Sequence, residues 1–359
     1  MAQTPDFLLA LNERTAWVDA LLLDPAMLDR VKPVHLRRLV AAYLERGGKR
    51  LRPAVLLFCC GAVGGDERLA LPAAASLELF HTWTLMHDDI IDHDALRRGG
   101  PTGHVLAAGL GAADWGLGPV EAADYGTSLS MLAGDVQHGL CVWMFSRCEG
   151  VPPPLLLQLI ADLELNIVAD LVEGETRDVQ LEQRPISDVT LDEVLRMMYL
   201  KTGVLYEFAG KAGAMLGLGT RDEQHPQVDA LRSFCANCGT AFQLQDDILG
   251  VVGNEGKLGK PVGSDITEGK RTPVLLTAWE RADAADRKRL GAAVGVAHAS
   301  PEAVLAAIEV MTRLGAVDAV AALAREHTQL ARQALRSLPE SQYTAWLSGW
   351  ADFMVEREF

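Results

Sequence analysis

The stretch FHTWTLMHDDIIDHDALRR, residues 80–98, sets the fold that we expect for this chain of 359 residues. Residues 73–79 before it are good to moderate helix formers without glycine or proline, so we expect one helix that ends near the acids. Residues four apart share a helix face, which places Asp88 beside Asp92. Two carboxylates at that spacing repel each other, and a hard divalent cation between them would remove the repulsion.

A second acidic stretch, FQLQDDILG, occupies residues 242–250 and repeats the arrangement. Its Gln243, Asp246 and Asp247 fall on one face of a helix. A single run of this kind is usually a solvated helix end. Two of them, each at the negative end of an apolar helix, favour two halves of one metal site. A small number of oxygen ligands is typical of Mg2+, which completes its shell with water and substrate phosphates.

A substrate that carries a diphosphate also needs cations to hold it. Basic residues stand in GGKRLRP at 47–53, in the pair Arg97 and Arg98, in KTG at 201–203, and between residues 257 and 271. The two glycines of the first motif would let its cations approach an anion closely, and arginine can fork onto phosphate oxygens in a way that lysine cannot. The sequence therefore predicts a site for diphosphates and Mg2+.

Together these residues resemble the polyprenyl synthetase family, the trans-isoprenyl diphosphate synthases. The resemblance spans nearly the whole chain, because the motifs follow the order and the spacing of the family. The matching motifs are GGKRLRP (47–53), HDDIIDHDALRRGGPT (87–102), LAGD (132–135), KTG (201–203), FQLQDDILG (242–250) and LGKPVGSDITEGKRT (258–272). The resemblance implies an all-α fold, a single large helical bundle around a central cavity (the isoprenoid synthase fold), with residues 1–359 as one domain.

The same resemblance implies a role for individual residues. The ligands of Mg2+ would be Asp88, Asp89, Asp92, Asp246 and Asp247. The diphosphate of isopentenyl diphosphate would be held by Lys49, Arg52, His81 and Arg98. Lys201 matches the lysine that binds the allylic diphosphate and shields the cation formed behind it. Further substrate-binding positions would be Arg97, Thr202, Gln243, Lys260 and Lys270. The catalytic positions would be Lys201, Asp88, Asp92 and Asp246.

The implied reaction is a prenyl transfer in isoprenoid and terpenoid biosynthesis. Metal ions make the diphosphate of an allylic substrate a leaving group, and the double bond of isopentenyl diphosphate attacks the resulting cation. Trp83, five positions before Asp88, matches the floor of the product tunnel in the family, which favours a C20 product (geranylgeranyl diphosphate), with C15 (farnesyl diphosphate) next. Without the resemblance, Trp83 would be interpreted as a core residue.

Three alternatives remain open from the sequence. A terpene cyclase of the same fold would also use DDxxD, but it would not need a second set of diphosphate-binding cations. A partner subunit of a heteromeric prenyl synthase would be expected to lose one acidic motif or the basic set. A metal phosphohydrolase is a minor alternative, suggested by the His-Asp pairs at His87 and His93.

Two stretches depart from the family pattern. Gly250 stands where many members have a third aspartate, which would remove a metal ligand or a group that supports one. Residues 103–128 are rich in glycine and alanine, and we expect them to form a loop that serves as a lid, a dimer contact or a neutral insertion.

Composition sets the remaining expectations. A net charge of -15 and a pI near 5.0 argue against a nucleic-acid partner. No apolar run reaches the roughly 18 residues that would span a bilayer, so we expect no stable membrane insertion. Six cysteines without a secretory signal suggest reduced thiols in a cytoplasmic protein, and the resemblance implies a homodimer. Strands should be nearly absent, with helices at residues 1–24, 35–45, 52–63, 71–92, 127–148, 154–183, 191–217 and 228–252.

Overall fold

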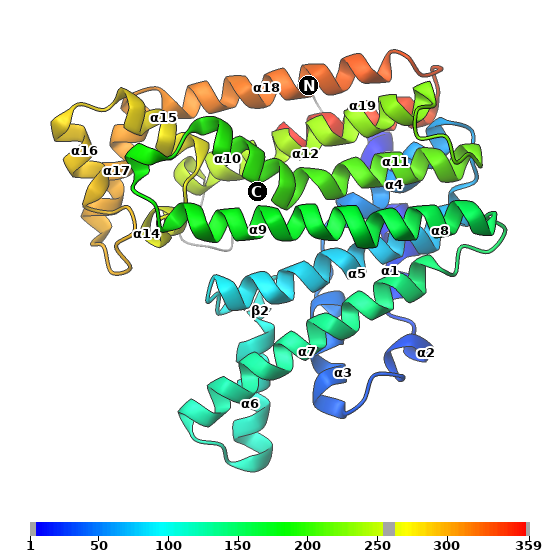
Figure 1. The fold of residues 1–359 in the computed structure, drawn as a ribbon, viewed down its shortest axis with the longest axis horizontal. Helices are drawn as coiled ribbons and strands as arrows, with labels where there is room; N and C mark the ends of the chain where they lie inside the picture. Colours follow the sequence, from blue (N-terminus) through cyan, green and yellow to red (C-terminus); the bar gives the residue numbers. More distant parts are fainter. Residues whose placement is uncertain (1–4, 254–262, 357–359) are drawn as a thin grey trace. The chain divides into compact units, whose positions relative to one another are not determined.

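The computed structural model describes residues 5–253 and 263–356 (Figure 1). The all-α prediction is confirmed, because the only strands among these residues are β1 (Leu96–Arg97) and β2 (Gly100–Pro101), which pair antiparallel. The chain divides into two compact units. Among the described residues, the N-terminal unit is built from residues 5–160 and Ala212–Asp222, and the C-terminal unit from Ala161–Lys211 and residues 223–253 and 263–356.

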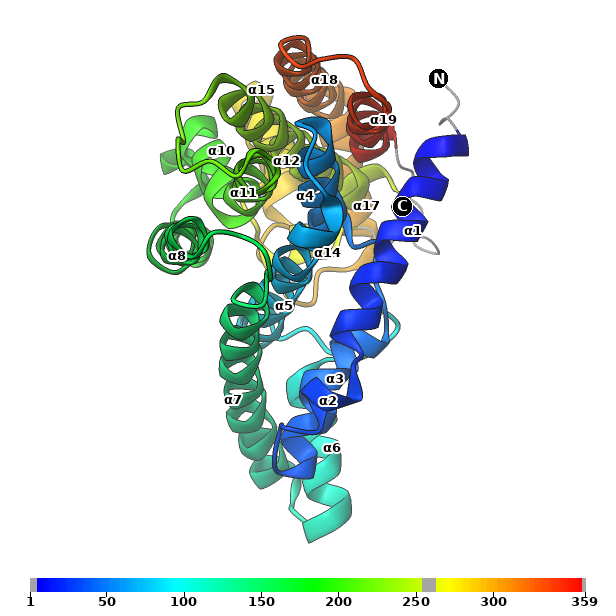
Figure 2. The same ribbon diagram turned by 90° about the vertical axis from the view of Figure 1, so that its right-hand side faces the viewer.

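The N-terminal unit is a set of helices around the long helix α5. Its elements are α1 (Pro5–Leu22), α2 (Pro25–Leu28), α3 (Val34–Glu45), α4 (Leu51–Ala62), α5 (Glu67–Ile91), α6 (Gly103–Trp115), α7 (Pro119–Phe145) and most of α8 (Pro153–Asp162). Helix α5 packs against α4 on one side and α7 on another, and α6 packs against α7 (Figure 2). The acidic stretch thus ends a helix that is covered on several sides.

Helix α5 begins earlier than expected. Asp66 caps it, because its side chain accepts a hydrogen bond from the backbone N–H of Arg68 at 2.9 Å. Pro72 therefore lies inside the helix, and the expected start at residue 71 is wrong by four residues. Residues 73–80 are almost completely shielded from solvent, which explains why apolar side chains occupy nearly all faces of this stretch; Ser76 and Glu78 are its buried polar residues.

The prediction of a loop at residues 103–128 is wrong. This segment forms α6 and the first part of α7, joined by a short connection at residues 116–118. Gly111 is inside α6 because α7 approaches there: a Cβ on Gly111 would lie 2.8 Å from a ring carbon of Tyr125. Glycine at this position serves close packing, and the alanines around it are strong helix formers.

The C-terminal unit is built around α12 and its neighbours. Its elements are η1 (Leu163–Ile167), α9 (Val168–Glu182), η2 (Ile186–Asp188), α10 (Leu191–Met198), η3 (Tyr199–Gly203), α11 (Val204–Leu218, shared with the N-terminal unit), α12 (Pro226–Val252), α14 (Ser264–Glu268), α15 (Pro273–Arg281), α16 (Ala284–Gly291), α17 (Pro301–Arg313), α18 (Ala316–Leu335) and α19 (Gln342–Glu356). Helix α12 packs lengthwise against α18 (Figure 1).

Two helices expected to be continuous each contain a π-helical turn. The turn η1 interrupts the stretch 154–183, and η3 interrupts the stretch 191–217. A π-helical turn inserts one extra residue per turn and often marks a functional position. The helices expected at 35–45, 52–63 and 228–252 are confirmed to within two residues at each end.

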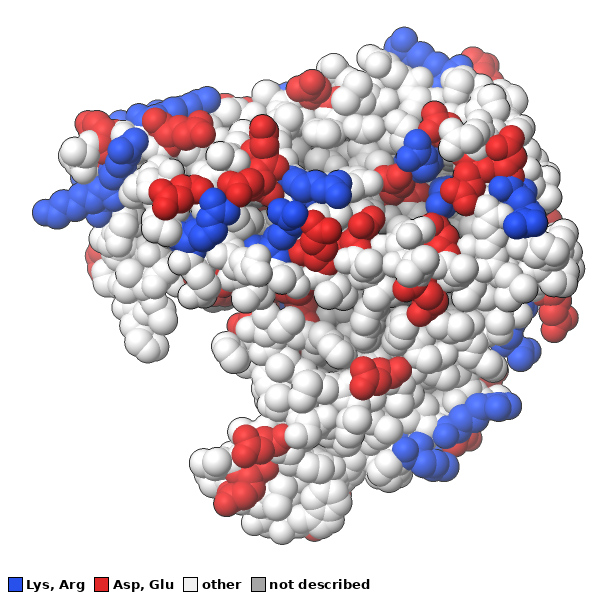
Figure 3. Space-filling model, viewed as in Figure 1, with Lys and Arg blue, Asp and Glu red and all other residues white. Residues whose placement is uncertain are grey.

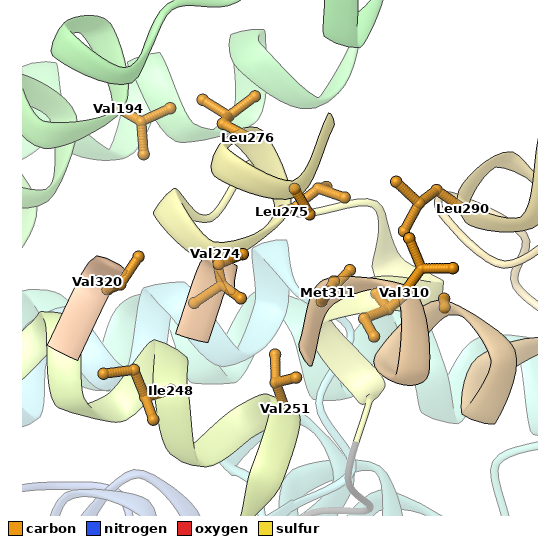
Figure 4. Packing of buried hydrophobic residues seen from close by; sticks show 14 of the residues in the cluster. Val194, Ile248, Val251, Val274, Leu275, Leu276, Leu290, Val310, Met311 and Val320 are labelled. Carbon is orange, nitrogen blue, oxygen red and sulfur yellow. The ribbon is translucent and has the colours of Figure 1, made fainter. Parts of the chain in front are cut away.

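A hydrophobic core fixes the C-terminal end of α12. Ile248 and Val251 point from α12 toward Val274 of α15 and Val320 of α18, with Met311 of α17 nearby (Figure 4). All of these side chains are at least 94% buried. This packing therefore fixes the position of the second acidic stretch within the C-terminal unit.

All six cysteines are buried and unoxidised, as expected. Burial raises the pKa of the Cys60 and Cys148 thiols to about 12. Within the two described ranges, none of the helices combines the length and the apolar composition that crossing a bilayer requires.

Candidate active site

The acids of the first motif lie at the end of α5 in the N-terminal unit. Helix α5 ends at Ile91 and Asp92 is its C-cap residue. Asp88 and Asp92 are half-buried, and each offers a carboxylate oxygen within 4.8 Å of the other. The prediction that this helix ends near the acids, with Asp88 beside Asp92, is confirmed.

Asp89 is in a different environment from its neighbours, because it is completely buried. It accepts hydrogen bonds from the hydroxyl of Tyr43 and from Nε of Arg97, the latter at 2.6 Å. Burial raises the pKa of Asp89, although Arg97 and Tyr43 oppose the shift. The hydroxyl of Tyr43 also accepts a hydrogen bond from the N–H of Gly103, so this network joins α3, α5 and α6.

Arg97 lies among three carboxylates of its own motif. In addition to Asp89, it contacts Asp88 at 3.3 Å and Asp94 at 2.9 Å. This guanidinium offsets the mutual repulsion of the acids. The short β1–β2 turn positions Arg97 and Arg98, which follow directly on the acidic helix end.

The basic side chains of the first basic motif differ in their exposure to solvent. Lys49 is exposed and Arg52 half-buried, while Arg50 between them is only 2% exposed. His81 lies on α5 near these arginines. Burial, followed by the charges of Arg52 and Arg98, holds the pKa of His81 well below its usual range, so the imidazole is neutral at pH 7. An electropositive environment of this kind favours anions.

Trp83 lies on the side of α5 that faces α7. Its ring centroid is 4.5 Å from that of His138 on α7 and 5.0 Å from that of Phe80. Gly134 makes room for His87 in the same contact, because a Cβ there would lie 2.2 Å from Nε2 of His87. The ring is thus fixed between two helices of the N-terminal unit.

In the C-terminal unit, the π-helical turn η3 carries Lys201 and Thr202. Helix α10 before it starts with a capping box, in which Thr190 and Glu193 satisfy each other's backbone N–H groups. Gly174 of α9 allows the turn to approach closely, since a Cβ there would lie 2.4 Å from the backbone nitrogen of Lys201.

Lys201 is held by two acids that the sequence reasoning did not identify as site residues. Its Nζ lies 2.7 Å from Asp178 and 2.9 Å from Glu175, both on α9. Asp178 is only 7% exposed, whereas Gln180 on the same helix is exposed. The sequence spacing could have identified Asp178, because Gly174 and Asp178 are four residues apart. They therefore share a helix face with the buried leucines of α9.

Gln243 and Asp247 of the second acidic motif share one face of α12, as their spacing predicts. Gln243 donates to Asp247 at 3.1 Å and accepts from the hydroxyl of Thr202 at 3.1 Å. Asp246 is half-buried, while Asp247 is only 8% exposed. Burial, with Asp265 as the next cause, raises the pKa of Asp247 well above its usual range.

Asp265 stands at the position that Gly250 leaves open. A Cβ on Gly250 would lie 3.0 Å from Oδ2 of Asp265, and the N–H of Gly263 donates to the carbonyl of Gly250 at 2.9 Å. Lys270 lies 3.5 Å from Glu268, and its N–H donates to the carbonyl of Asp265. Lys260 lies outside the described residues.

In each unit, half-buried aspartates thus lie near the end of a helix, and a cation is paired with neighbouring acids. Residues 33–311 match the model of the family described as Polyprenyl synthetase. The chain belongs to the polyprenyl synthetase family. The resemblance inferred from the motifs is confirmed.

Individual polyprenyl synthetases are similar over nearly the whole chain. A short chain isoprenyl diphosphate synthase of Methanothermobacter thermautotrophicus is 38% identical over 91% of this chain and 92% of its own. The structure of a geranylgeranyl pyrophosphate synthetase from Pyrococcus horikoshii superimposes with a TM-score of 0.83 at 33% identity, covering 98% of both chains. A geranylgeranyl pyrophosphate synthase from Corynebacterium glutamicum, complexed with isoprenyl diphosphate and magnesium, has a TM-score of 0.82 at 28% identity, covering 99% of this chain and 100% of its own.

The donor set of this polyprenyl synthetase fits a hard divalent cation. Asp88, Asp92 and Asp246 are half-buried carboxylates, so they offer oxygen atoms that remain partly accessible. Oxygen donors of this type select Mg2+ or Ca2+ over softer metals. The buried Asp89 and Asp247 are instead bonded to Arg97 and Gln243.

Proposed function

We propose that this polyprenyl synthetase is a short-chain trans-prenyltransferase that condenses isopentenyl diphosphate with an allylic diphosphate. The product would be geranylgeranyl diphosphate (C20) or farnesyl diphosphate (C15). The observation that carries the proposal is the presence of two acid-and-cation sets, one in each unit: Asp88, Asp92 and Arg97 in the first, Asp246 and Lys201 in the second. The names of the relatives support the same reaction class. In this proposal, residues 1–359 act as one synthase domain.

The metal-binding part of the proposal assigns Mg2+ to the aspartates of both motifs. Asp88, Asp92 and Asp246 would bind it directly, with Asp89 and Asp247 supporting them. When bound, Mg2+ neutralises the allylic diphosphate and so makes it a better leaving group. The magnesium in the Corynebacterium glutamicum structure supports this choice of metal.

The protein's own residues would bind and orient the two substrates. Lys201 would hold the allylic diphosphate, and its charge, 2.7 Å from Asp178, is positioned before the substrate arrives. Thr202 and Gln243 would add hydrogen bonds, and Lys260 and Lys270 would contact the same diphosphate. Lys49, Arg52, Arg97 and Arg98, with the neutral His81, would hold isopentenyl diphosphate. The apolar surroundings of both acidic motifs would keep water from the cation.

A terpene cyclase remains the second candidate, because it would use the same acidic motifs. It needs only one diphosphate-binding set, however, and here the N-terminal unit brings His81 close to Arg52 and Arg98. That electropositive cluster is separate from Lys201 in the sequence and supports a second diphosphate. A non-catalytic partner subunit is disfavoured because both acidic motifs and the basic set are retained, with Gly250 as the only feature that favours it.

The test is to incubate the purified protein with MgCl2, labelled isopentenyl diphosphate and dimethylallyl, geranyl or farnesyl diphosphate, and to measure product size. A C20 or C15 diphosphate that disappears with EDTA supports the proposal. Release of a hydrocarbon from a single prenyl diphosphate, without incorporation of isopentenyl diphosphate, would support the cyclase instead.

A homodimer and a cytoplasmic location complete the proposal. Helices α6 and α7 contain no lysine or arginine, and the surface that they expose in Figure 3 is mostly white, with a few acidic side chains. Leu132 and Met131 of α7 are 54% and 45% exposed, and Trp115 at the end of α6 is 60% exposed. Exposed apolar side chains gathered on two adjacent helices are typical of a protein interface. The six buried, reduced cysteines support a reducing compartment.

A further inference from the structure

The turn that carries Lys49 has an unusual backbone. Gly47, Gly48 and Arg50 have positive φ angles of 72°, 156° and 46°. Glycine adopts such angles without steric conflict, but they are disfavoured for arginine. A strained conformation of this kind persists only where its surroundings hold it. Contacts from outside the turn must therefore fix Arg50.

Arg50 is fixed from three sides, with its side chain fully buried. Its Nε donates to Asp19 of α1 at 2.8 Å, and its Nη2 donates to the carbonyl of Leu44 at 2.9 Å. Its Nη1 donates to Oε1 of Glu78 on α5 at 2.5 Å. The middle cation of GGKRLRP thus points into the protein, whereas Lys49 is exposed.

Arg98 holds the other end of the same turn. Its Nη1 donates to the carbonyl of Gly47 at 2.6 Å and to that of Tyr43 at 3.0 Å. Its Nη2 donates to Oε1 of Glu78 at 3.1 Å. The guanidinium lies so close to the turn that a Cβ on Gly48 would be 3.1 Å from its central carbon. One carboxylate oxygen therefore accepts from both arginines.

Glu78 is the charge that makes this pair of arginines possible. It is 2% exposed, and two guanidinium groups this close would repel each other strongly if no buried acid compensated them. The contacts of Arg98 use three of its five N–H donors, which leaves two for an anion. Glu78 therefore reduces the repulsion between the two arginines and orients Arg98, while Arg98 keeps N–H donors for an anion.

We infer that Glu78 is a positioning residue for the binding of isopentenyl diphosphate. By holding Arg98 directly and the turn at residues 47–50 through Arg50, it keeps Lys49 in place for the diphosphate. The inference rests on the proposed function, because it takes isopentenyl diphosphate as the ligand of this cluster.

The experiment measures the Kd of isopentenyl diphosphate by calorimetry, in the absence of an allylic substrate, together with steady-state kinetics. In Glu78→Gln, which keeps the shape but removes the charge, we expect Kd and KM for isopentenyl diphosphate to rise about tenfold. The KM for the allylic diphosphate should change by less than about twofold, since only one substrate loses its site. Glu78→Asp, which restores the charge, should recover part of the affinity.

Glu67→Gln is the matched control. Glu67 is on the same helix, is 6% exposed, and accepts from Nε and Nη2 of Arg14 at 3.0 and 2.6 Å. The substitution removes a similarly buried charge pair, Glu67 with Arg14, that does not contact the turn at residues 47–50. We expect a lower Tm in Glu67→Gln but an unchanged affinity for isopentenyl diphosphate.

The possible outcomes separate the inference from the proposed function. Unchanged or tighter binding in Glu78→Gln, or equal weakening in Glu67→Gln, would overturn the positioning role while the condensation activity stands. If Glu78→Gln does not fold, Arg50→Lys removes the guanidinium that joins the turn to Glu78. Wild-type affinity for isopentenyl diphosphate in that variant would overturn the inference as well. A wild-type protein that neither binds nor condenses isopentenyl diphosphate would overturn both.

Discussion

Gly250 of α12 faces the carboxylate of Asp265, and a Cβ at Gly250 would lie 3.0 Å from Oδ2 of that residue. The carboxylate of Asp265 thus occupies the space into which a third aspartate of the second motif would extend. Asp265 is also the main neighbouring charge that raises the pKa of Asp247. The glycine in this motif is therefore accompanied by an acid from a later part of the chain.

Gly250→Asp should destabilise the protein in the absence of metal. It adds a carboxylate beside Asp265 and Asp247, and like charges this close repel by about 1 kcal/mol or more. Gly250→Asn has nearly the same shape without the charge, so it should unfold at a higher temperature than Gly250→Asp when both are measured in EDTA. Equal melting temperatures of the two variants would mean that steric conflict with Asp265, and not charge repulsion, disfavours a side chain at position 250.

Lys201→Met should reduce kcat by about 100-fold, because it removes the cation that would bind the allylic diphosphate. Lys211→Met is its control, since Lys211 is also paired with two acids, Asp162 at 2.6 Å and Glu223 at 3.5 Å. That variant should lower the Tm and change kcat by less than about threefold. A similar loss of kcat in both variants would assign Lys201 to stability alone. Single-turnover kinetics with saturating substrates provide the measurement.

Trp83→Ala should lengthen the product, because it opens the space that the ring fills between α5 and His138. Product sizing by chromatography should show chains longer than those of the wild type. Trp143→Ala is the control: this tryptophan of α7 lies beside Arg147 and should leave product length unchanged. Unchanged products in Trp83→Ala would leave Trp83 a core residue.

Asp247→Asn should raise the melting temperature of the metal-free protein at pH 7 by a few degrees. Burial raises the folded-state pKa of Asp247, so the folded state binds a proton more tightly than the unfolded state does. The carboxyl therefore lowers stability as pH rises from its unfolded pKa, about 3.9, through its folded pKa. The advantage of the asparagine should be complete above that window and vanish below it. The same pH dependence of the melting temperature in the wild type and in Asp247→Asn would contradict this account.

Leu132→Glu should dissociate the proposed homodimer, because it places a charge on the apolar face of α7. Sedimentation velocity should detect a monomer with unchanged helical content. Leu305→Glu, at a 60% exposed leucine of α17, is the control and should leave the mass unchanged. A dimer that survives Leu132→Glu would place the interface elsewhere.

The acidic motifs could be predicted in detail because helix spacing alone determines which residues share a face. Gln243 and Asp247 are four apart, and the hydrogen bond between them follows from that spacing. The same rule placed Asp88 beside Asp92. Local geometry of this kind requires no knowledge of the rest of the chain.

Roles that depend on long-range contacts could not be predicted in this way. Arg50 and Lys49 are adjacent in one basic motif, yet one is buried on Glu78 and the other is exposed. Asp178 and Lys201 are 23 residues apart in the sequence, so helix spacing does not predict the hydrogen bond between them. The loop expected at residues 103–128 was wrong because Gly103, Gly111 and Gly126 allow α6 and α7 to pack closely, and only Gly116 and Gly118 lie in the connection between them.

The reactivity of the buried cysteines can be used to measure local opening of each unit. Thiol reagents attack the exposed thiolate, and burial raises the pKa of Cys60 and Cys148 to about 12 while it also blocks access. Alkylation of these two cysteines would therefore report transient opening of the N-terminal unit, and alkylation of Cys235 and Cys238 that of the C-terminal unit. Mass spectrometry of labelled peptides could follow the two units separately in one sample, without any engineered probe.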